Sequence, residues 1–284
     1  MRQRWSIGLY VGSSPLLLSC PAALENGILH AADVTDMEAE FVADPFMIQH
    51  DGCWSIFFEV FDAVQRRGSI GLAQSPDLRN WRYQQIVMRE PFHVSYPHVF
   101  KADGTYYMVV ETLGRGCVSL YRADCFPTAW SFMTPLIFGE YADPSIVRHS
   151  GRWWLFVCAS PYAHDVLQLF SAESLEGDWR EHPASPLVTG DARRARPAGR
   201  VIAFEGNLIR YAQDCVSKYG SRLRAFSIHT LTDGEYAEHE VPQNPVRRPR
   251  TQAWSRGGMH HVDAHCLSSG RWVACVDGWS LVET

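Results

Sequence analysis

The sequence has no pair of cysteines spaced as in a metal-binding knuckle. Its eight cysteines are scattered singly along 284 residues, with no C-x-x-C motif. A chain of this length can bury a core without cross-links, so scattered cysteines argue against a disulfide scaffold and are typical of reduced, mostly buried thiols. We therefore expect a cytoplasmic protein.

A membrane span and an excess of positive charge are also missing. No apolar run reaches the length needed to cross a bilayer. Residues 17–20 (LLSC), after Arg2 and Arg4, are similar to the end of a lipoprotein signal peptide, but residues 12–15 (GSSP) interrupt the apolar stretch that such a signal needs. The formal net charge of −5 argues against a nucleic-acid partner, which would require a basic face.

What the sequence does contain is a fivefold repeat, with an aromatic content of 12% that suits strands. Short segments, four of them containing proline, recur as residues 43–48 (ADPFMI), 95–100 (SYPHVF), 142–147 (ADPSIV), 195–201 (ARPAGRV) and 261–266 (HVDAHC). A glycine-centred turn and a second strand follow each of them, at residues 51–54, 103–106, 150–153, 205–208 and 269–272. Such repetition is typical of propeller blades.

The last repeat lacks its outer strands, and the N-terminus supplies a matching segment. Residues 6–10 (SIGLY) are similar to the third strand of the first repeat, residues 69–73 (SIGLA). We therefore predict an all-β, five-bladed β-propeller that spans residues 1–284 as one domain, with its last blade closed by the N-terminal strand.

The first strand of each propeller blade lines the axis, so equivalent positions form a ring around one channel. The repeat alignment places five residues in this ring: Asp44, Tyr96, Asp143, Arg196 and Asp263. Carboxylates that face a common cavity require a cation, a proton or a substrate to compensate them, which favours a functional site. The alternative is that an aspartate before proline merely caps a turn.

The second strands add acidic residues where apolar stretches end. Glu59 and Glu111 occupy equivalent places and are candidate proton donors, or are paired inside the protein, while Asp214 follows the second strand of the fourth repeat.

Histidines gather in the last repeat. His261, Asp263 and His265 alternate along a strand and share one side, where they can position a sugar or a water, or hold a metal. We do not favour the metal, because only one strand contributes, and we expect no cofactor. His260 should face the other way. His93 is a further candidate substrate contact.

Arginines gather in the fourth repeat, where Arg196 and Arg200 share parity and can both reach the axis. Their guanidinium groups either bind a phosphate or carboxylate of a substrate or neutralise the aspartates of the ring.

The chain resembles the N-terminal propeller domain of glucosamine inositolphosphorylceramide transferase and its bacterial stand-alone relatives. The resemblance runs through residues 33–36 (DVTD), 41–47 (FVADPFM), 90–97 (EPFHVSYP), 195–200 (ARPAGR) and 258–265 (GMHHVDAH). In the plant transferase the propeller accompanies a separate glycosyltransferase domain, for which this chain has no room, so transfer activity does not follow from the resemblance.

More distantly, the Asp-Pro strands resemble the five-bladed furanosidase propellers: arabinanases, xylosidases, invertases and levansucrases. That resemblance implies a catalytic base or nucleophile at Asp44 and a supporting carboxylate at Asp143. It also implies an acidic glutamate in blade four, where this chain has Arg196 instead, so Glu59, Glu111 or Glu205 would have to protonate the leaving group.

These observations lead to three hypotheses. The first is a carbohydrate-active enzyme that hydrolyses or transfers a glycosyl substrate with a negative group, using Asp44, Asp143, Glu111 and Glu59 for chemistry and Tyr96, His93, Arg196, Arg200, Asp214, His261, Asp263 and His265 for binding. The second is a non-catalytic glycan- or glycolipid-binding module that works beside a separate glycosyltransferase. The third is a metal-dependent hydrolase.

Overall fold

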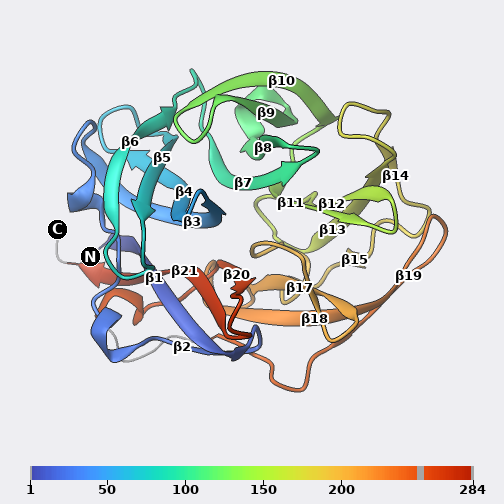
Figure 1. The fold of residues 1–284 in the computed structure, drawn as a ribbon. Coiled ribbons are helices and arrows are strands. Elements are labelled where there is room, and N and C mark those ends of the chain that lie inside the picture. The colour runs from blue at the N-terminus through green and yellow to red at the C-terminus, as the bar shows by residue number, and fades with distance from the viewer. Residues whose placement is uncertain (1, 248–252, 283–284) are drawn as a thin grey trace.

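The computed structural model describes residues 2–247 and 253–282, and these form five antiparallel sheets arranged around an axis (Figure 1). The predicted all-β five-bladed propeller is confirmed. The first blade contains β3 (Ala39–His50), β4 (Cys53–Asp62), β5 (Gly68–Ser75) and β6 (Arg82–Met88). The second blade contains β7 (Ser95–Ala102), β8 (Thr105–Thr112), β9 (Cys117–Cys125) and β10 (Ala129–Phe138). The third contains β11 (Ala142–His149), β12 (Arg152–Cys158), β13 (Val166–Ala172), β14 (Arg180–Glu181) and β15 (Val188–Thr189).

The fourth and fifth blades complete the ring. The fourth contains β16 (Ile202–Phe204), β17 (Asn207–Asp214), β18 (Arg222–Leu231) and β19 (Tyr236–Glu240), and the fifth contains β20 (Val262–Cys266), β21 (Trp272–Val282), β1 (Arg2–Ser14) and β2 (Leu17–Ser19). The short 3₁₀ turns are η1 (Ala22–Leu24), η2 (Ala31–Asp33), η3 (Leu113–Arg115) and η4 (Ala253–Ser255).

The N-terminal strand closes the last blade, as the repeat predicts. The sheet order is β2-β1-β21-β20, and β1 pairs antiparallel with β21 from Arg2 opposite Val282 to Gly12 opposite Trp272. Arg2 and Val282 therefore lie side by side on the same blade, and the ring is closed by backbone hydrogen bonds.

Five apolar clusters fill the gaps between neighbouring blades. Each combines strongly apolar side chains of two adjacent sheets, such as Phe57 of blade one with Met108 of blade two, and Trp154 of blade three with Ile228 of blade four. A smaller cluster of Trp5, Ala43 and Trp279 lies where blades five and one meet. The alternation of the strands thus buries a core between sheets rather than within one sandwich.

A repeated irregularity marks the first strand of blades one to three. Asp44, Tyr96 and Asp143, each just before a proline, have φ of 51°, 51° and 52°, and the pairing with the second strand shifts register at each of these positions. Aspartate tolerates a positive φ, whereas tyrosine rarely adopts it, so the backbone at Tyr96 is the strained one of the three. The bulge turns each of these residues out of the ladder.

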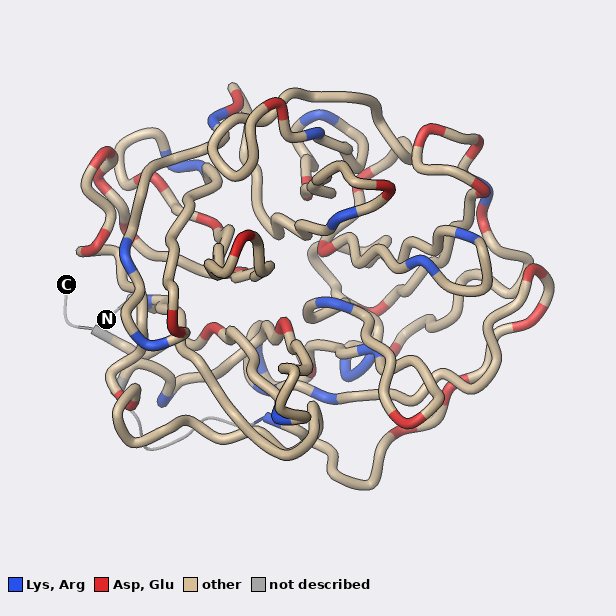
Figure 2. The backbone as a smooth tube through the Cα atoms, in the orientation of Figure 1, with Lys and Arg blue, Asp and Glu red and all other residues tan. Residues whose placement is uncertain are grey.

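Charged residues of both signs are interspersed around the ring (Figure 2). All eight cysteines are free, and Cys117, Cys158, Cys215 and Cys275 are buried. Within the described residues, we find no helix with the length and apolar character of a membrane span.

Candidate functional site at the propeller axis

Two aspartates and their partners form a buried ionisable cluster where the inner strands converge. Asp44 and Asp143 are 6% and 2% exposed, and each affects the pKa of its neighbours electrostatically, Asp143 raising that of Asp44. A buried carboxylate is costly unless it is protonated or paired. The partners of each aspartate therefore decide what the cluster can do.

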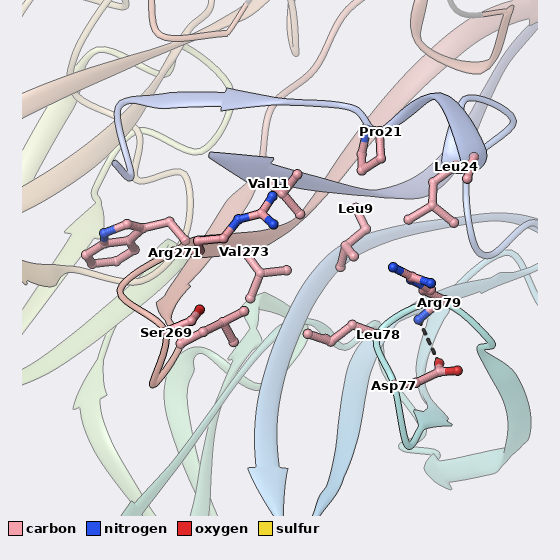
Figure 3. A pocket seen from close by; sticks show the side chains of 13 residues that line it. Leu9, Val11, Pro21, Leu24, Asp77, Leu78, Arg79, Ser269, Arg271 and Val273 are labelled. Carbon is pink, nitrogen blue, oxygen red and sulfur yellow. Dashed lines mark hydrogen bonds between the residues drawn. The ribbon is translucent and has the colours of Figure 1, made fainter. Parts of the chain in front are cut away.

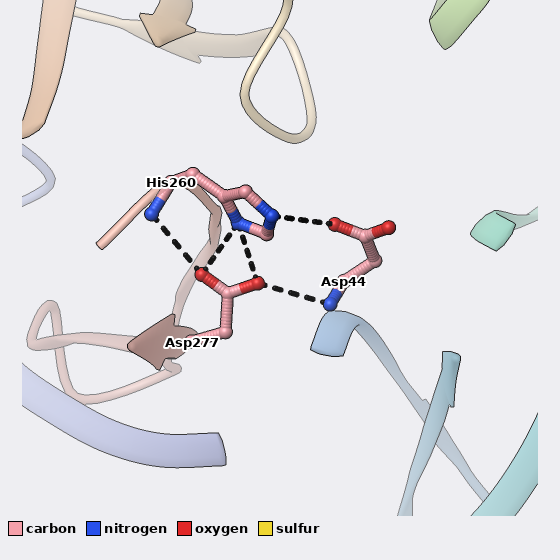
Figure 4. Close-up of side chains that lie close together, drawn as sticks. All are labelled: Asp44, His260 and Asp277. Carbon is pink, nitrogen blue, oxygen red and sulfur yellow. Dashed lines mark hydrogen bonds and ion pairs between the residues drawn. The ribbon is translucent and has the colours of Figure 1, made fainter. Parts of the chain in front are cut away.

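Asp44 lies in a row with His260 and Asp277 (Figure 4). The Nδ1 of His260 is 2.7 Å from Oδ2 of Asp277, which also accepts the backbone N–H of Asp44 at 3.0 Å. The Nε2 of His260 faces Oδ1 of Asp44 at 3.8 Å, and the imidazole stacks on Trp5 with centroids 4.0 Å apart. Asp277 thus orients His260 so that its free nitrogen points to Asp44.

The pKa values of the two aspartates in this row are shifted in opposite directions. Burial raises the pKa of Asp44 to about 7, although His260 opposes the rise. Burial alone would lower the pKa of His260, but the charge and hydrogen bond of Asp277, followed by Asp44, raise it overall. Burial would raise the pKa of Asp277, but His260 outweighs it, so Asp277 stays ionised. Asp44 can therefore exchange a proton near neutral pH, while the surroundings of His260 favour its protonated form.

Asp143 is held by a different pair of groups. The Nε of Arg196 donates to Oδ2 of Asp143 at 2.5 Å, and Nε2 of Gln213 donates to the same oxygen at 2.6 Å. The Nη1 of Arg196 also donates to the carbonyl of Pro161 at 2.8 Å and lies 2.9 Å from Nδ1 of His164. Arg196 thus neutralises Asp143 and keeps it in a fixed orientation.

Glu59 and Glu111 are buried beside the aspartates. Oε2 of Glu111 accepts the backbone N–H of Asp143 at 2.8 Å, which repeats the contact of Asp277 with Asp44 two blades away. Burial, then the charge of Asp143, raises the pKa of Glu111 to about 8, and burial raises that of Glu59 well above its ordinary value. Glu111 is thus mostly protonated at neutral pH and can donate a proton, and burial favours the neutral form of Glu59 as well.

His93 lies at the open side of Glu59. Its Nδ1 accepts the backbone N–H of Gly68 at 2.8 Å, so Nε2 carries the proton and points at Oε1 of Glu59, 3.5 Å away. Burial lowers the pKa of His93, which is therefore neutral at neutral pH. With 37% of its side chain exposed, His93 connects Glu59 to the surface.

In blade five the strand register places His261, rather than Asp263, in the ring. Asp263 pairs with Cys275, two residues before Asp277, just as His98 pairs with Val109, two residues before Glu111. The residue equivalent to Tyr96 is therefore two positions before Asp263. The alignment of the five repeats placed Asp263 in the ring, two positions too late, because the last repeat lacks the proline that marks the bulge in blades one to three.

His261 is fully buried at this position. Its Nδ1 is 3.9 Å from Oδ1 of Asp44, and its ring contacts Phe46 and Tyr96 edge to face. Neither ring nitrogen has a hydrogen-bond partner in the described part of the chain, and burial lowers the pKa of His261 to about 4. A neutral imidazole therefore lines the axis next to Asp44.

Asp263 and Arg200 form an ion pair that connects neighbouring blades. The Nε of Arg200 donates to Oδ1 of Asp263 at 2.7 Å, and Oδ2 of Asp263 accepts the backbone N–H of Met47 at 2.7 Å. The Nη2 of Arg200 donates to the carbonyl of Val99 at 2.9 Å, and His265 lies 2.9 Å from Asp263. Arg200, Asp263 and His265 thus tie blade five to its neighbours.

Tyr96 and Asp214 are also engaged inside the protein. The hydroxyl of Tyr96 lies 2.8 Å from Oγ of Ser145 and accepts the backbone N–H of Gly199 at 2.5 Å. Asp214 accepts from Nε of Arg224 at 3.0 Å. Tyr96 reaches the axis, whereas the ion pair of Asp214 lies within blade four.

The row of Asp44, His260 and Asp277 is also the candidate for a metal ion, since its ligand atoms lie within 4.8 Å of one another. Both oxygens of Asp277, however, already accept hydrogen bonds, Oδ2 from the backbone of Asp44 and Oδ1 from that of His260 at 3.2 Å. The donor set therefore suits proton exchange better than a cation.

Sequence reasoning missed His260 and Asp277. Alternation along the strand places His260 opposite to His261, but His260 precedes β20, so strand alternation does not govern it. Asp277 carried a usable signal, because it ends an apolar second strand as Glu59 and Glu111 do.

Comparison with known proteins shows what the chain is similar to. Residues 2–279 match the family model described as "Glucosamine inositolphosphorylceramide transferase 1, N-terminal". The chain is 36% identical over 300 residues to glucosamine inositolphosphorylceramide transferase 1 of Oryza sativa subsp. japonica and 32% identical over 295 residues to that of Arabidopsis thaliana. These matches cover 96% of the chain but only 40% and 39% of the two relatives.

Solved structures share the fold at low identity. The catalytic domain of Coprinopsis cinerea GH62 α-L-arabinofuranosidase has a TM-score of 0.61 and 14% identity, covering 92% of this chain and 83% of its own. The α-L-arabinanase of Cellvibrio cellulosa has a TM-score of 0.55 and 14% identity, covering 70% and 78%. The resemblance to the transferase N-terminal family is confirmed, and the likeness to the furanosidase propellers is confirmed at the level of the fold.

Proposed function

Because this chain belongs to the family described as glucosamine inositolphosphorylceramide transferase 1, N-terminal, we propose that it is a carbohydrate-active enzyme whose axial cluster acts on a glycosyl substrate. The observation that carries the proposal is the pairing of Asp44, with a pKa of about 7, and Glu111, with a pKa of about 8, around one axis. Glycosyl cleavage or transfer needs one carboxyl group that accepts a proton and another that donates one.

In this proposal Asp44 is the base or nucleophile. His260, fixed by Asp277, exchanges a proton with Asp44 and keeps it ready at neutral pH. Glu111 or Glu59 is the donor to the leaving oxygen, since burial raises the pKa of both carboxyl groups and so favours their protonated forms. Asp143, held by Arg196 and Gln213, orients the substrate.

We assign the negative group of the substrate to Arg196 rather than Arg200. Each guanidinium nitrogen of Arg200 has a protein partner that joins blades. Arg196 is also paired, but its partners lie in blade three, and the His164 and Tyr219 side chains beside it are only partly buried, which supports an approach of a phosphate or carboxylate from that side.

The test begins with a search for a ligand. Phosphorylated, nucleotide-linked and neutral sugars are screened for thermal stabilisation, since a bound ligand raises the melting temperature by mass action. For any sugar that is turned over, we expect Asp44→Asn to lower kcat at least ~100-fold, the usual scale for a lost acid or base. The exposed Asp178→Asn serves as the matched control. Full turnover by Asp44→Asn would end the proposal.

A second candidate is favoured by the coverage of the relatives. The chain spans about 40% of the length of the curated transferases it matches, so their transferase activity can lie elsewhere in them. On this hypothesis the axis binds a glycan or glycolipid without product, next to a separate glycosyltransferase, and Asp44→Asn changes the affinity alone. The eight free thiols support a cytoplasmic location for either function.

A further inference from the structure

A pocket of about 450 Å³ lies between blades five and one, away from the axial cluster (Figure 3). Its lining comes from four separate segments: residues 9–11 of β1, residues 21–24 around η1, residues 77–79 between β5 and β6, and residues 267–273 at the turn into β21. None of the axial acids lines it. The pocket is therefore a feature separate from the proposed catalytic site.

The floor and sides of this pocket are apolar. Leu9 and Val273, which are 2% and 0% exposed, form the base, and Leu24, Leu78 and Leu267 form the sides. Pockets of a few hundred Å³ with an apolar lining and a few polar groups are typical small-molecule sites. A ligand here would bury its own apolar portion.

Two arginines stand at opposite ends of the apolar lining. Figure 3 shows Arg271 beside Val11 and Arg79 near Leu24. Both side chains are exposed, and no hydrogen bond or ion pair of either guanidinium is found within the described residues. Each is thus available to an anion at the edge of the apolar lining.

The one acidic residue of the pocket is turned to the backbone. Asp77 accepts the N–H groups of Arg79 and Asn80 at 2.9 and 2.8 Å, and the side-chain amide of Asn80 at 2.7 Å. These bonds fix the loop and lower the pKa of Asp77, so its carboxylate serves the turn. It does not pair with the guanidinium of Arg79.

The same loop holds Leu78 in an unusual conformation. Its φ is 63°, a region that a branched apolar residue rarely occupies, and its side chain projects into the pocket. A glycine or asparagine would make this turn without strain. The leucine adds apolar surface to the pocket and also packs against the core cluster between blades five and one.

From these observations we propose that the pocket between blades five and one binds an amphipathic anion. The ligand is an acyl or similar apolar chain that lies on Leu9, Leu78 and Val273, with a terminal carboxylate or phosphate held by Arg79 or Arg271. The proposal is independent of the catalytic hypothesis, because the pocket shares no residue with the axial cluster.

The test uses decanoate and decyl phosphate as probes, measured by calorimetry and thermal shift on the full chain. We expect both to bind, and Arg79→Gln combined with Arg271→Gln to weaken binding at least tenfold. Arg180→Gln, an exposed arginine of β14, is the matched control and should leave the affinity within twofold. A tighter response to one probe identifies the head group as carboxylate or phosphate.

The apolar half of the site is tested separately. Leu24→Asp should weaken decanoate binding at least tenfold, and acetate and inorganic phosphate should bind far more weakly than the decyl compounds. Equal binding of the short anions would overturn the proposal in favour of a simple anion site. Absence of decanoate and decyl phosphate binding, or unchanged affinity in the arginine variants, would overturn it outright. Asp44→Asn should bind both probes as the parent does.

Discussion

Glu111 is a carboxyl group whose surroundings favour the neutral form. Burial and the charge of Asp143 raise its pKa from 4.5 to about 8, so the carboxyl group of Glu111 ionises at a lower pH in the unfolded chain than in the folded protein. Stability is therefore lost as the pH rises from about 4.5 to about 8, because the unfolded state binds fewer protons there. The carboxyl group weakens the fold at neutral pH.

We predict that Glu111→Gln stabilises the protein. Glutamine keeps an oxygen to accept the N–H of Asp143 and removes the ionisation. With each pKa unit worth roughly 1.4 kcal/mol, we expect a gain of at least ~1 kcal/mol at pH 8 that disappears near pH 4. Urea unfolding at both pH values measures it, with the exposed Glu176→Gln as control. A gain that is equal at both values would contradict this account.

Residue identities at the axis could be predicted only where the repeat was regular. Asp44 and Asp143 follow from the Asp-Pro segments, and Glu59 and Glu111 from the ends of apolar strands. His260 could not be predicted, because it lies before β20, where the alternation of a regular strand does not set the direction of the side chain. Its partner Asp277 depends on how the fifth blade meets the first, which no single repeat encodes.

At the scale of elements, the segment from Arg196 to Arg200 departs most from its repeat. In blade four the first regular strand, β16, starts only at Ile202, after Gly199. The carbonyl of Gly199 accepts from Ser145 at 2.8 Å, and its N–H donates to Tyr96 at 2.5 Å. Gly199 therefore joins blades two, three and four at the axis.

We predict that Gly199→Ala is strongly destabilising. Its φ is +123°, and an added Cβ would come within 1.9 Å of the carbonyl oxygen of Val262, which is backbone and cannot rotate away. We expect a loss of more than ~2 kcal/mol, on the scale of strained backbone and steric overlap. Gly104→Ala, whose φ is +84° with open space around it, is the control and should cost about 1 kcal/mol. If urea unfolding showed the same loss of unfolding free energy for both variants, the backbone would have moved to relieve the contact of the added Cβ with Val262, and the prediction would be wrong.

At the scale of the whole molecule, closure depends on one pair of strands. The sequence predicted this pairing from the likeness of residues 6–10 to residues 69–73, and β1 indeed runs along β21. This pairing could be predicted because the blades are sequence repeats. The fifth repeat lacks its outer strands, so a matching segment elsewhere in the chain has to supply them. No comparable sequence pattern predicts the ion pair of Arg200 and Asp263, which connects blades through side chains.

We predict that removing residues 1–19 abolishes cooperative folding. The loss exposes the edge of β21 and removes Ile7 and Leu9 from the cluster between blades five and one. Circular dichroism and thermal unfolding should show one sharp transition for the parent, as the single-domain prediction requires, and none for the shortened chain. A permuted chain, with residues 1–19 moved behind residue 284 through a glycine-rich linker, should regain the transition because the same ladder forms as a hairpin. If the shortened chain melted like the parent, the N-terminal strand would not be what holds the ring closed.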